Sequence, residues 1–159
     1  MSRPSPFERN AAQVLARNPK ARHDYHILET WECGLVLTGT EVKSVRAGKV
    51  SLKESYALLR KAEVWLEGMH IAPYESGGYA NHAPVRPRKL LLHRREIRRM
   101  IGSVEQQGLA LIPLDVHVVR GRAKVTLALG RGKKVHDKRE ELRRRAAERE
   151  LARAVSRRR

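Results

Sequence analysis

The chain has 159 residues, of which 41% are hydrophobic, and its 34 lysines and arginines outnumber 17 aspartates and glutamates, giving a net charge of +17. This length fits one domain with extensions and is short for two full domains. So large a charge requires a polyanionic partner or a membrane surface, with nucleic acid as the leading interpretation. No signal peptide and no apolar run of the roughly 18 residues of a membrane span are present, and a single cysteine excludes an internal disulfide. We therefore expect a cytoplasmic protein with no membrane partner.

The first third of the chain changes from an irregular segment to a strand. Prolines among polar residues predict a flexible N-terminal extension over residues 1–20, with at most one or two helical turns at residues 11–17. Apolar and polar residues then alternate over residues 25–37, which predicts a long, half-buried strand with Glu32 on its polar face. Residues 51–54 have a serine and a glutamate three apart, which fits a capping box and predicts a short helical turn.

The middle of the chain predicts a hairpin, a loop and a helix, in that order. Two apolar runs, residues 56–60 and 64–71, are separated by three residues and predict the hairpin. Residues 73–88 contain three prolines and a Gly-Gly pair and predict a loop long enough to be functional. Apolar residues at helical spacing over residues 97–104 predict a helix that ends at Gly108 and carries arginines on its opposite face.

The last apolar segments predict a second hairpin and, with it, the fold class. Residues 109–119 and 123–129 flank an Arg-Gly-Arg turn. Short strands, few helices and glycine-rich turns predict a mostly β fold over residues 21–130. For so basic a chain, we expect a closed antiparallel β-barrel like the OB fold, with flanking short helices.

No constellation of residues in the sequence predicts an enzyme. The seven histidines are scattered, the one cysteine has no zinc-binding spacing, and no glycine loop has the spacing that holds phosphate and magnesium. Paired carboxylates for a two-metal nuclease are also missing, so we expect no metal and no cofactor, with an RNA nuclease as the weakest alternative. Because only seven residues are aromatic, recognition by base stacking is disfavoured. The composition favours recognition of a folded RNA through its backbone and shape.

The C-terminal segment has helical propensity but little apolar surface. Residues 131–159 contain 13 basic and 5 acidic side chains. The pairs Glu140 with Arg144 and Glu141 with Arg145 favour a helix by about 0.2–0.5 kcal/mol each. Isolated helices of this length are marginal in water, and the arginine triplets repel one another. We expect a tail that is disordered or frayed when free and helical when a polyanion neutralises it, the alternative being a merely solubilising tail.

Four separated motifs give the chain a family resemblance. These are ARHDY, GTEVKSVRAGKV, RPRKLLLH and GKKVHDKR, in this order. From about residue 18 to the C-terminus the chain resembles the SsrA-binding protein (SmpB) family. The resemblance implies an OB-like barrel that binds the tRNA-like domain of transfer-messenger RNA. It also implies a tail that becomes a helix in the empty mRNA channel of a stalled ribosome, in an adaptor without catalytic activity that acts in trans-translation as a monomer, one copy per RNA.

The resemblance also implies two sets of RNA-binding residues. Contacts with transfer-messenger RNA are expected from Glu32, Lys43, Arg46, Arg88, Lys89, Leu91, His93 and Lys124. Contacts with the 16S rRNA of the decoding centre and mRNA channel are expected from Gly132, Lys133, Lys134, His136, Asp137, Lys138 and Arg139. Within the second set, His136 is the candidate for base stacking and Asp137 for capping the helix that follows it.

Alternatives remain for single residues and for the whole chain. Glu32 is expected to accept hydrogen bonds from base amino groups or to orient a neighbouring cation, or it turns inward as a structural partner. His93 stands where many family members have asparagine. The basic residues of the barrel are alternatively a generic solvated surface. The alternative function is that of a ribosomal protein of OB class that binds rRNA constitutively.

Overall fold

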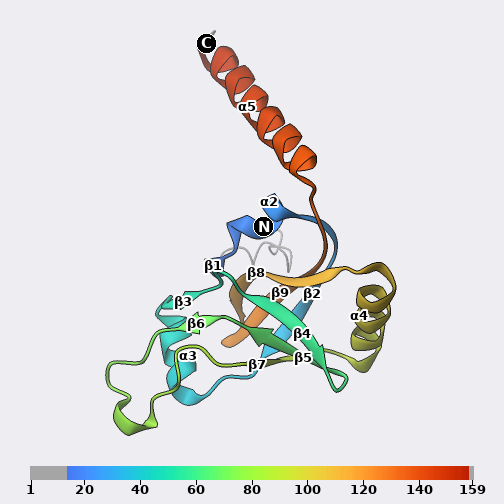
Figure 1. Cartoon of the computed structure of the whole chain (residues 1–159). Coiled ribbons are helices and arrows are strands. Elements are labelled where there is room, and N and C mark those ends of the chain that lie inside the picture. The colour runs from blue at the N-terminus through green and yellow to red at the C-terminus, as the bar shows by residue number, and fades with distance from the viewer. Residues whose placement is uncertain (1–13, 158–159) are drawn as a thin grey trace, which may run out of the picture.

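Residues 14–157 are described by a computed structural model of the chain, apart from the side chains of residues 106–107 and 135–137. They form a mostly β body with short helices, from which one long helix projects (Figure 1). The helices are α2 (Pro19–Asp24), α3 (Gly39–Arg46), η1 (Gly78–Ala80), α4 (Arg94–Gln107) and α5 (Val135–Arg157). The strands are β1 (Val14–Arg17), β2 (Tyr25–Leu35), β3 (Val50–Ser51), β4 (Tyr56–Arg60), β5 (Glu63–Glu67), β6 (His70–Ile71), β7 (Arg88–Leu91), β8 (Ala110–Val119) and β9 (Arg122–Gly132).

Antiparallel pairing joins most of the strands into one sheet. Its order is β1-β8-β4-β5-β7-β2-β9, and β8 also pairs with β9. The β4–β8 pairing consists of a single residue pair, Ala57 with Leu111, whereas β8 and β9 pair along nearly their whole length. The mostly β fold with short helices is therefore confirmed, and the closed OB-like barrel stays a prediction.

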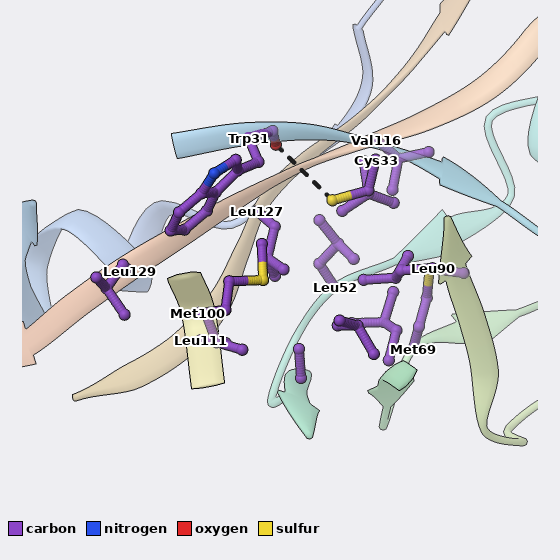
Figure 2. Close-up of a cluster of buried hydrophobic side chains, with 14 of the residues drawn as sticks. Trp31, Cys33, Leu52, Met69, Leu90, Met100, Leu111, Val116, Leu127 and Leu129 are labelled. Carbon is purple, nitrogen blue, oxygen red and sulfur yellow. Dashed lines mark hydrogen bonds between the residues drawn. The ribbon is translucent and has the colours of Figure 1, made fainter. Parts of the chain in front are cut away.

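The hydrophobic core lies on the inner side of this sheet. Trp31 and Cys33 of β2 meet Leu127 of β9 there, and Met100 of α4 packs against the same cluster (Figure 2). Burial raises the pKa of the Cys33 thiol to about 12, so this cysteine is an apolar filler rather than a reactive group. The alternation of buried and exposed residues along β2 confirms the predicted half-buried strand, which ends at Leu35.

Both predicted hairpins are confirmed, and their turns explain why the chain reverses there. Lys61 and Ala62 have φ values of 52° and 58°, and Arg120 and Gly121 have values of 51° and 77°. Two consecutive positive φ values are typical of the type I′ turn, which matches the twist of antiparallel strands. The second strand of the first hairpin breaks at Gly68, where a Cβ atom would lie 2.9 Å from the carbonyl oxygen of Glu54.

The predicted helix over residues 97–104 is α4, and it ends as expected. Met100 is fully buried, and Ile97 and Val104 pack against the core. Gly108 has a φ of 61° and donates its backbone N–H to the carbonyl of Val104, which is a glycine-dependent helix end. The arginines of this helix at positions 94, 95, 98 and 99 are exposed.

Two local predictions are wrong. Residues 14–17 form β1 rather than helical turns, because they pair with β8 and Asn18 donates its backbone N–H to the carbonyl of Leu114 at 2.8 Å. Within the predicted extension over residues 1–20, residues 14–17 thus form β1 and Pro19 begins α2, while residues 1–13 lie outside the described part. The predicted turn at residues 51–54 is not helical, since Glu54 has a φ of 61° and Ser51 belongs to β3.

A buried ion cluster ties α3 to β7 and the loop before it. Glu41 and Arg88 both have 0% exposed surface, and Nε of Arg88 donates to Oε2 of Glu41 at 2.6 Å. Arg86 also binds this carboxylate, and Nη1 of Arg88 donates to the carbonyl of Met69 at 2.7 Å. Burial alone would raise the pKa of Glu41, but hydrogen bonds from Arg86, the Thr38 backbone and Arg88 lower it to about 2. The predicted loop of residues 73–88 is held against the body through this cluster.

Replacing Glu41 by glutamine should destabilise the fold by about 3–5 kcal/mol near pH 7, because the buried charge of Arg88 loses its counter-ion. The measurement is the free energy of unfolding in urea. Because the folded-state pKa of Glu41 is depressed to about 2 from an ordinary 4.5, its contribution is complete above pH 4.5 and is lost as pH falls toward 2. The difference between wild type and E41Q should shrink over that range.

The matched control is E63Q, which removes the pair between Glu63 and Lys89, where both side chains are about two-fifths exposed. It should change stability by less than about 1 kcal/mol. A difference between wild type and E41Q that is equally large at pH 7 and pH 3 would contradict this account of Glu41.

Candidate nucleic-acid interface

Strand register brings three of the predicted RNA-binding residues to one outward face. Gly34 of β2 lies opposite Leu91 of β7 on one side and opposite Lys124 of β9 on the other. Glu32 is two residues before Gly34 and therefore points to the same face. A Cβ atom at Gly34 would lie 3.1 Å from that of Leu91, so the glycine makes room for this side chain, which is 52% exposed. An exposed leucine of β7, a carboxylate of β2 and a lysine of β9 thus share this face.

The Glu32 carboxylate is bound to a histidine of β8. Oε1 of Glu32 lies 3.1 Å from Nε2 of His117, and Nδ1 of the same ring lies 2.7 Å from Oδ1 of Asp115. Thr126 donates its hydroxyl to this Asp115 oxygen at 2.9 Å. These residues line a cleft of about 340 Å³ whose walls also include Arg17 and Arg22. Glu32 keeps 44% of its side chain exposed, so it both contacts a neighbouring polar group and faces outward.

The cluster changes the proton affinity of its members. The hydrogen bond to Asp115 raises the pKa of His117, and this outweighs the opposing effect of burial. For Asp115, burial would raise the pKa, but hydrogen bonds from His117 and Thr126 hold it below its ordinary value. The arrangement therefore favours a protonated histidine between carboxylates.

The other cations predicted on the body are exposed or partly exposed, with one exception. Lys43 lies 5.0 Å from the centre of the Tyr74 ring, and Arg46 donates to the carbonyl of Gly121 at 3.2 Å. Lys89 pairs with Glu63 at 3.3 Å. Arg88 is the exception, because its guanidinium is fully buried and bonded within the protein. Arg88 is therefore not an RNA contact, and the prediction for this residue is wrong.

His93 begins helix α4 at the edge of the same region. It is exposed, and its backbone N–H donates to the side chain of Glu96 at 3.2 Å in a capping box. Its role at the helix start fixes the position of its backbone. The exposed arginines of α4 at positions 94, 95 and 98 follow directly, so His93 lies between Leu91 and a basic helical face.

The base of α5 is held to α2 by ion pairs and backbone contacts. The Lys133 N–H donates to the carbonyl of Asp24 at 2.8 Å, and Nζ of Lys138 lies 3.2 Å from the carboxylate of Asp24. Lys133 also pairs with Glu141, which in turn binds Arg145 at 2.6 Å. Hydrogen bonds from His23 and Lys138 lower the pKa of Asp24. Two lysines predicted to bind rRNA thus also contact carboxylates of this chain.

The remaining tail positions divide between β9 and the helix. Gly132 is the last residue of β9, and Lys134 and Arg139 are exposed. Helix α5 begins at Val135, two residues before Asp137, so the prediction that Asp137 caps it is wrong. The side chains of His136 and Asp137 lie outside the described residues. From residue 142 to residue 157 every side chain is exposed, and α5 extends away from the body (Figure 1).

Two further observations concern the kind of partner. Within the described residues, no helix combines the length and apolar character that a membrane crossing requires. The same residues contain no group of three or more histidine, cysteine or acidic side chains arranged to hold a metal ion.

The comparisons with known proteins agree with one another. The family described as SmpB protein matches residues 15–157. The chain belongs to this family. The SsrA-binding protein of Nostoc punctiforme is 60% identical over 144 residues, which is 90% of this chain and 93% of the relative. That of Desulforudis audaxviator is 58% identical over 147 residues, or 92% of this chain and 96% of the relative.

A solved structure also matches this chain. It comes from a study described as "tmRNA-SmpB: a journey to the center of the bacterial ribosome". It has a TM-score of 0.64 and 55% sequence identity, and the match covers 80% of this chain and 94% of that one. The mostly β body described above is thus the SmpB fold.

The anchoring of α5 predicts a difference between two glutamates of this helix. Replacing Glu141 by glutamine should speed hydrogen exchange in residues 138–145 by about threefold, since a partly buried pair worth somewhat under 1 kcal/mol is weakened. Hydrogen exchange followed by mass spectrometry measures this. The control is E150Q, because Glu150 is exposed in the same helix. Equal effects of the two substitutions would show that the contacts with Lys133 and Arg145 do not hold the helix.

Proposed function

We propose that this chain is an RNA-binding adaptor of trans-translation, which binds the tRNA-like domain of transfer-messenger RNA and delivers it to stalled ribosomes. The observation that carries the proposal is membership of the SmpB family over residues 15–157. Relatives named for binding SsrA, and a structural neighbour whose description names tmRNA, SmpB and the bacterial ribosome, support it. The net charge of +17 supports it, since it suits a polyanionic partner. The adaptor acts in the cytoplasm, as a monomer, without catalysis or cofactor.

The body of the protein is the part that binds transfer-messenger RNA. We assign this contact to the outward face of β2, β7 and β9 with Glu32, Leu91 and Lys124, to His93 beside it, and to the exposed cations Lys43, Arg46 and Lys89. The face combines a carboxylate that accepts hydrogen bonds from base amino groups, an apolar contact and cations that bind phosphate. The strands that carry it form an OB-like closed barrel in this proposal, an architecture suited to RNA binding.

The tail is the part that contacts the ribosome. Helix α5 has 23 residues and therefore spans about 35 Å at 1.5 Å per residue, a length suited to the empty mRNA channel. The helix has no apolar face that could dock on the body, and its arginines are exposed. Phosphates of rRNA are therefore the expected partners along its length. In this proposal only the base is anchored in the free protein, and the distal turns become stably helical on binding. Gly132, Lys133, Lys134, His136, Asp137, Lys138 and Arg139 lie at the decoding centre.

Sedimentation separates this function from that of a constitutive ribosomal protein. The chain should migrate with ribosomes in extracts that contain transfer-messenger RNA and stalled ribosomes, and much less in extracts that lack either one. The measurement is the fraction of the protein in the ribosome peak of a sucrose gradient. Association that is the same in all these extracts would favour the constitutive rRNA-binding protein.

Removal of the tail tests whether the body binds transfer-messenger RNA and the tail acts on the ribosome. A chain truncated after Gly132 keeps all of β9 and should bind isolated transfer-messenger RNA with nearly unchanged affinity, while tagging of stalled nascent chains is abolished. Both forms should also lose affinity in parallel between 50 and 200 mM salt, by about a thousandfold if six phosphates are neutralised by the body. A much smaller salt dependence for the truncated chain would show that the tail, and not the body, provides the phosphate contacts.

A further inference from the structure

A row of polar side chains crosses the outward face on which Glu32 lies. Thr126 of β9 is opposite Glu32 of β2 and also opposite Asp115 of β8. His117 follows Asp115 by two residues along β8, so its side chain points to the same face. The row therefore connects a surface carboxylate through a histidine to a second carboxylate that lies deeper. His117 itself is only 4% exposed, although it is on this outward face.

The contacts of His117 are best satisfied when each ring nitrogen carries a proton. Each nitrogen lies within hydrogen-bond distance of a carboxylate oxygen, at 2.7 Å from Asp115 and 3.1 Å from Glu32. An ionised carboxylate can only accept, and a neutral imidazole can donate from only one nitrogen. The observed geometry is therefore satisfied by an imidazolium between two carboxylates, in agreement with the raised pKa of His117.

We propose that His117 is a positioning residue, which fixes the Glu32 carboxylate in the orientation that meets RNA and offsets its charge. This inference rests on the proposed function, in which Glu32 faces transfer-messenger RNA. A freely rotating carboxylate at a surface that binds phosphates would repel them and lose entropy on binding. When His117 holds it, the Glu32 carboxylate presents its remaining acceptor sites in one direction. The net charge of the cluster is also less negative by one unit than it would be with a neutral ring.

The other charged groups that surround the cluster are two arginines and a lysine. Arg17 of β1 lies opposite Asp115, and Lys124 of β9 lies opposite His117. Arg22 of α2 lines the same cleft. Arginine and lysine as classes stay protonated far above neutral pH, whereas histidine changes charge in this range. His117 is therefore the member of the cluster whose proton is lost as pH rises from neutral.

The direction of the pH effect follows from the sign of the shift. Because the pKa of His117 is raised, the imidazolium persists at neutral pH and is lost as pH increases through that raised value. Loss of this proton frees Glu32 and makes the net charge of the cluster more negative by one unit. Affinity for RNA should therefore decrease as pH rises, and the decrease should require both His117 and Glu32.

The test measures the affinity of the full-length protein for the tRNA-like domain of transfer-messenger RNA between roughly pH 6 and pH 9, in wild type, H117Q, E32Q and the double variant. Wild type should lose affinity by about tenfold over this range, as expected when a hydrogen bond to a charged group is lost. H117Q should be weaker by a similar factor at the acidic end and nearly independent of pH. The double variant should bind no more weakly than E32Q, since the effect of His117 acts through Glu32.

The matched control is H70Q, which removes an exposed histidine of β6 and should keep the pH profile of wild type. If H117Q does not fold, as judged by its thermal unfolding, the E32Q variant alone provides the test. In E32Q the pKa of His117, followed by NMR, should be lower than in wild type, and the RNA affinity should lose its pH dependence. A merely structural histidine would show neither change.

The outcomes for this inference and for the proposed function are distinct. Wild type that binds the RNA, with H117Q or E32Q retaining the wild-type pH profile, overturns the role of His117 and leaves the proposed function in place. Wild type that does not bind the RNA overturns the proposed function itself. A profile that flattens equally in H70Q would show that surface charge in general, rather than His117, causes the pH dependence.

Discussion

The register of β2 between β7 and β9 is the constraint on which both the core and the candidate interface depend. Side chains alternate along a strand, so a shift by one residue would move every buried side chain of β2 to solvent. In the observed register Cys33 lies opposite Val125 inside the body, and Glu32 lies opposite Thr126 outside it. The hydrophobic effect that buries the inner row therefore also determines which polar side chains face a partner. Packing and recognition are specified by the same pairing.

Opposite charges serve two different purposes in this basic protein. Inside the body, the Glu41 carboxylate neutralises the buried guanidinium of Arg88, and this pair joins α3 to β7. On the surface, cations such as Lys124 are the groups that bind an RNA backbone in the proposed function. A carboxylate near such a surface would normally oppose phosphate binding. His117 lies between Asp115 and Glu32, and in the role proposed for it this contact removes most of that cost. The acidic residues are thus arranged so that they organise cations rather than repel the partner.

Local pattern was sufficient to predict much of the fold, because its main elements depend on local periodicity. The alternation over residues 25–37 predicts β2, and the helical spacing over residues 97–104 predicts α4. Strand β1 could not be predicted in this way, since its four residues are a strand only through pairing with β8, about a hundred positions later. The same limit explains the failed helical turn at residues 51–54, where the local capping pattern yields to a strand pairing with β6.

The candidate site was predictable in part, for a related reason. The family resemblance identifies Glu32, Leu91 and Lys124, and the structure brings these three to one face. Arg88 belongs to the same motif as Leu91, so the motif alone cannot separate a buried structural arginine from an exposed one. Its burial is decided by Glu41, which is 47 positions away. His117 lies in an apolar strand outside the four motifs, and only the register of β8 against β9 connects it with Glu32.

The contacts at the base of α5 suit the proposed function, in which this helix changes partners. Apolar docking would hold the tail to the body with a large free energy, and entry into an RNA channel would then have to overcome it. The tail has instead exposed apolar side chains that are few and far apart, such as Leu142, Leu151 and Val155. Ion pairs between lysines and carboxylates at the surface are weak, and the same ammonium groups bind phosphate in a nucleic acid. In the proposed function, the partly exposed Lys138 can therefore exchange the carboxylate of Asp24 for a phosphate of the ribosome at little cost, while β9 and the more buried pair of Lys133 with Glu141 keep the start of the tail in place.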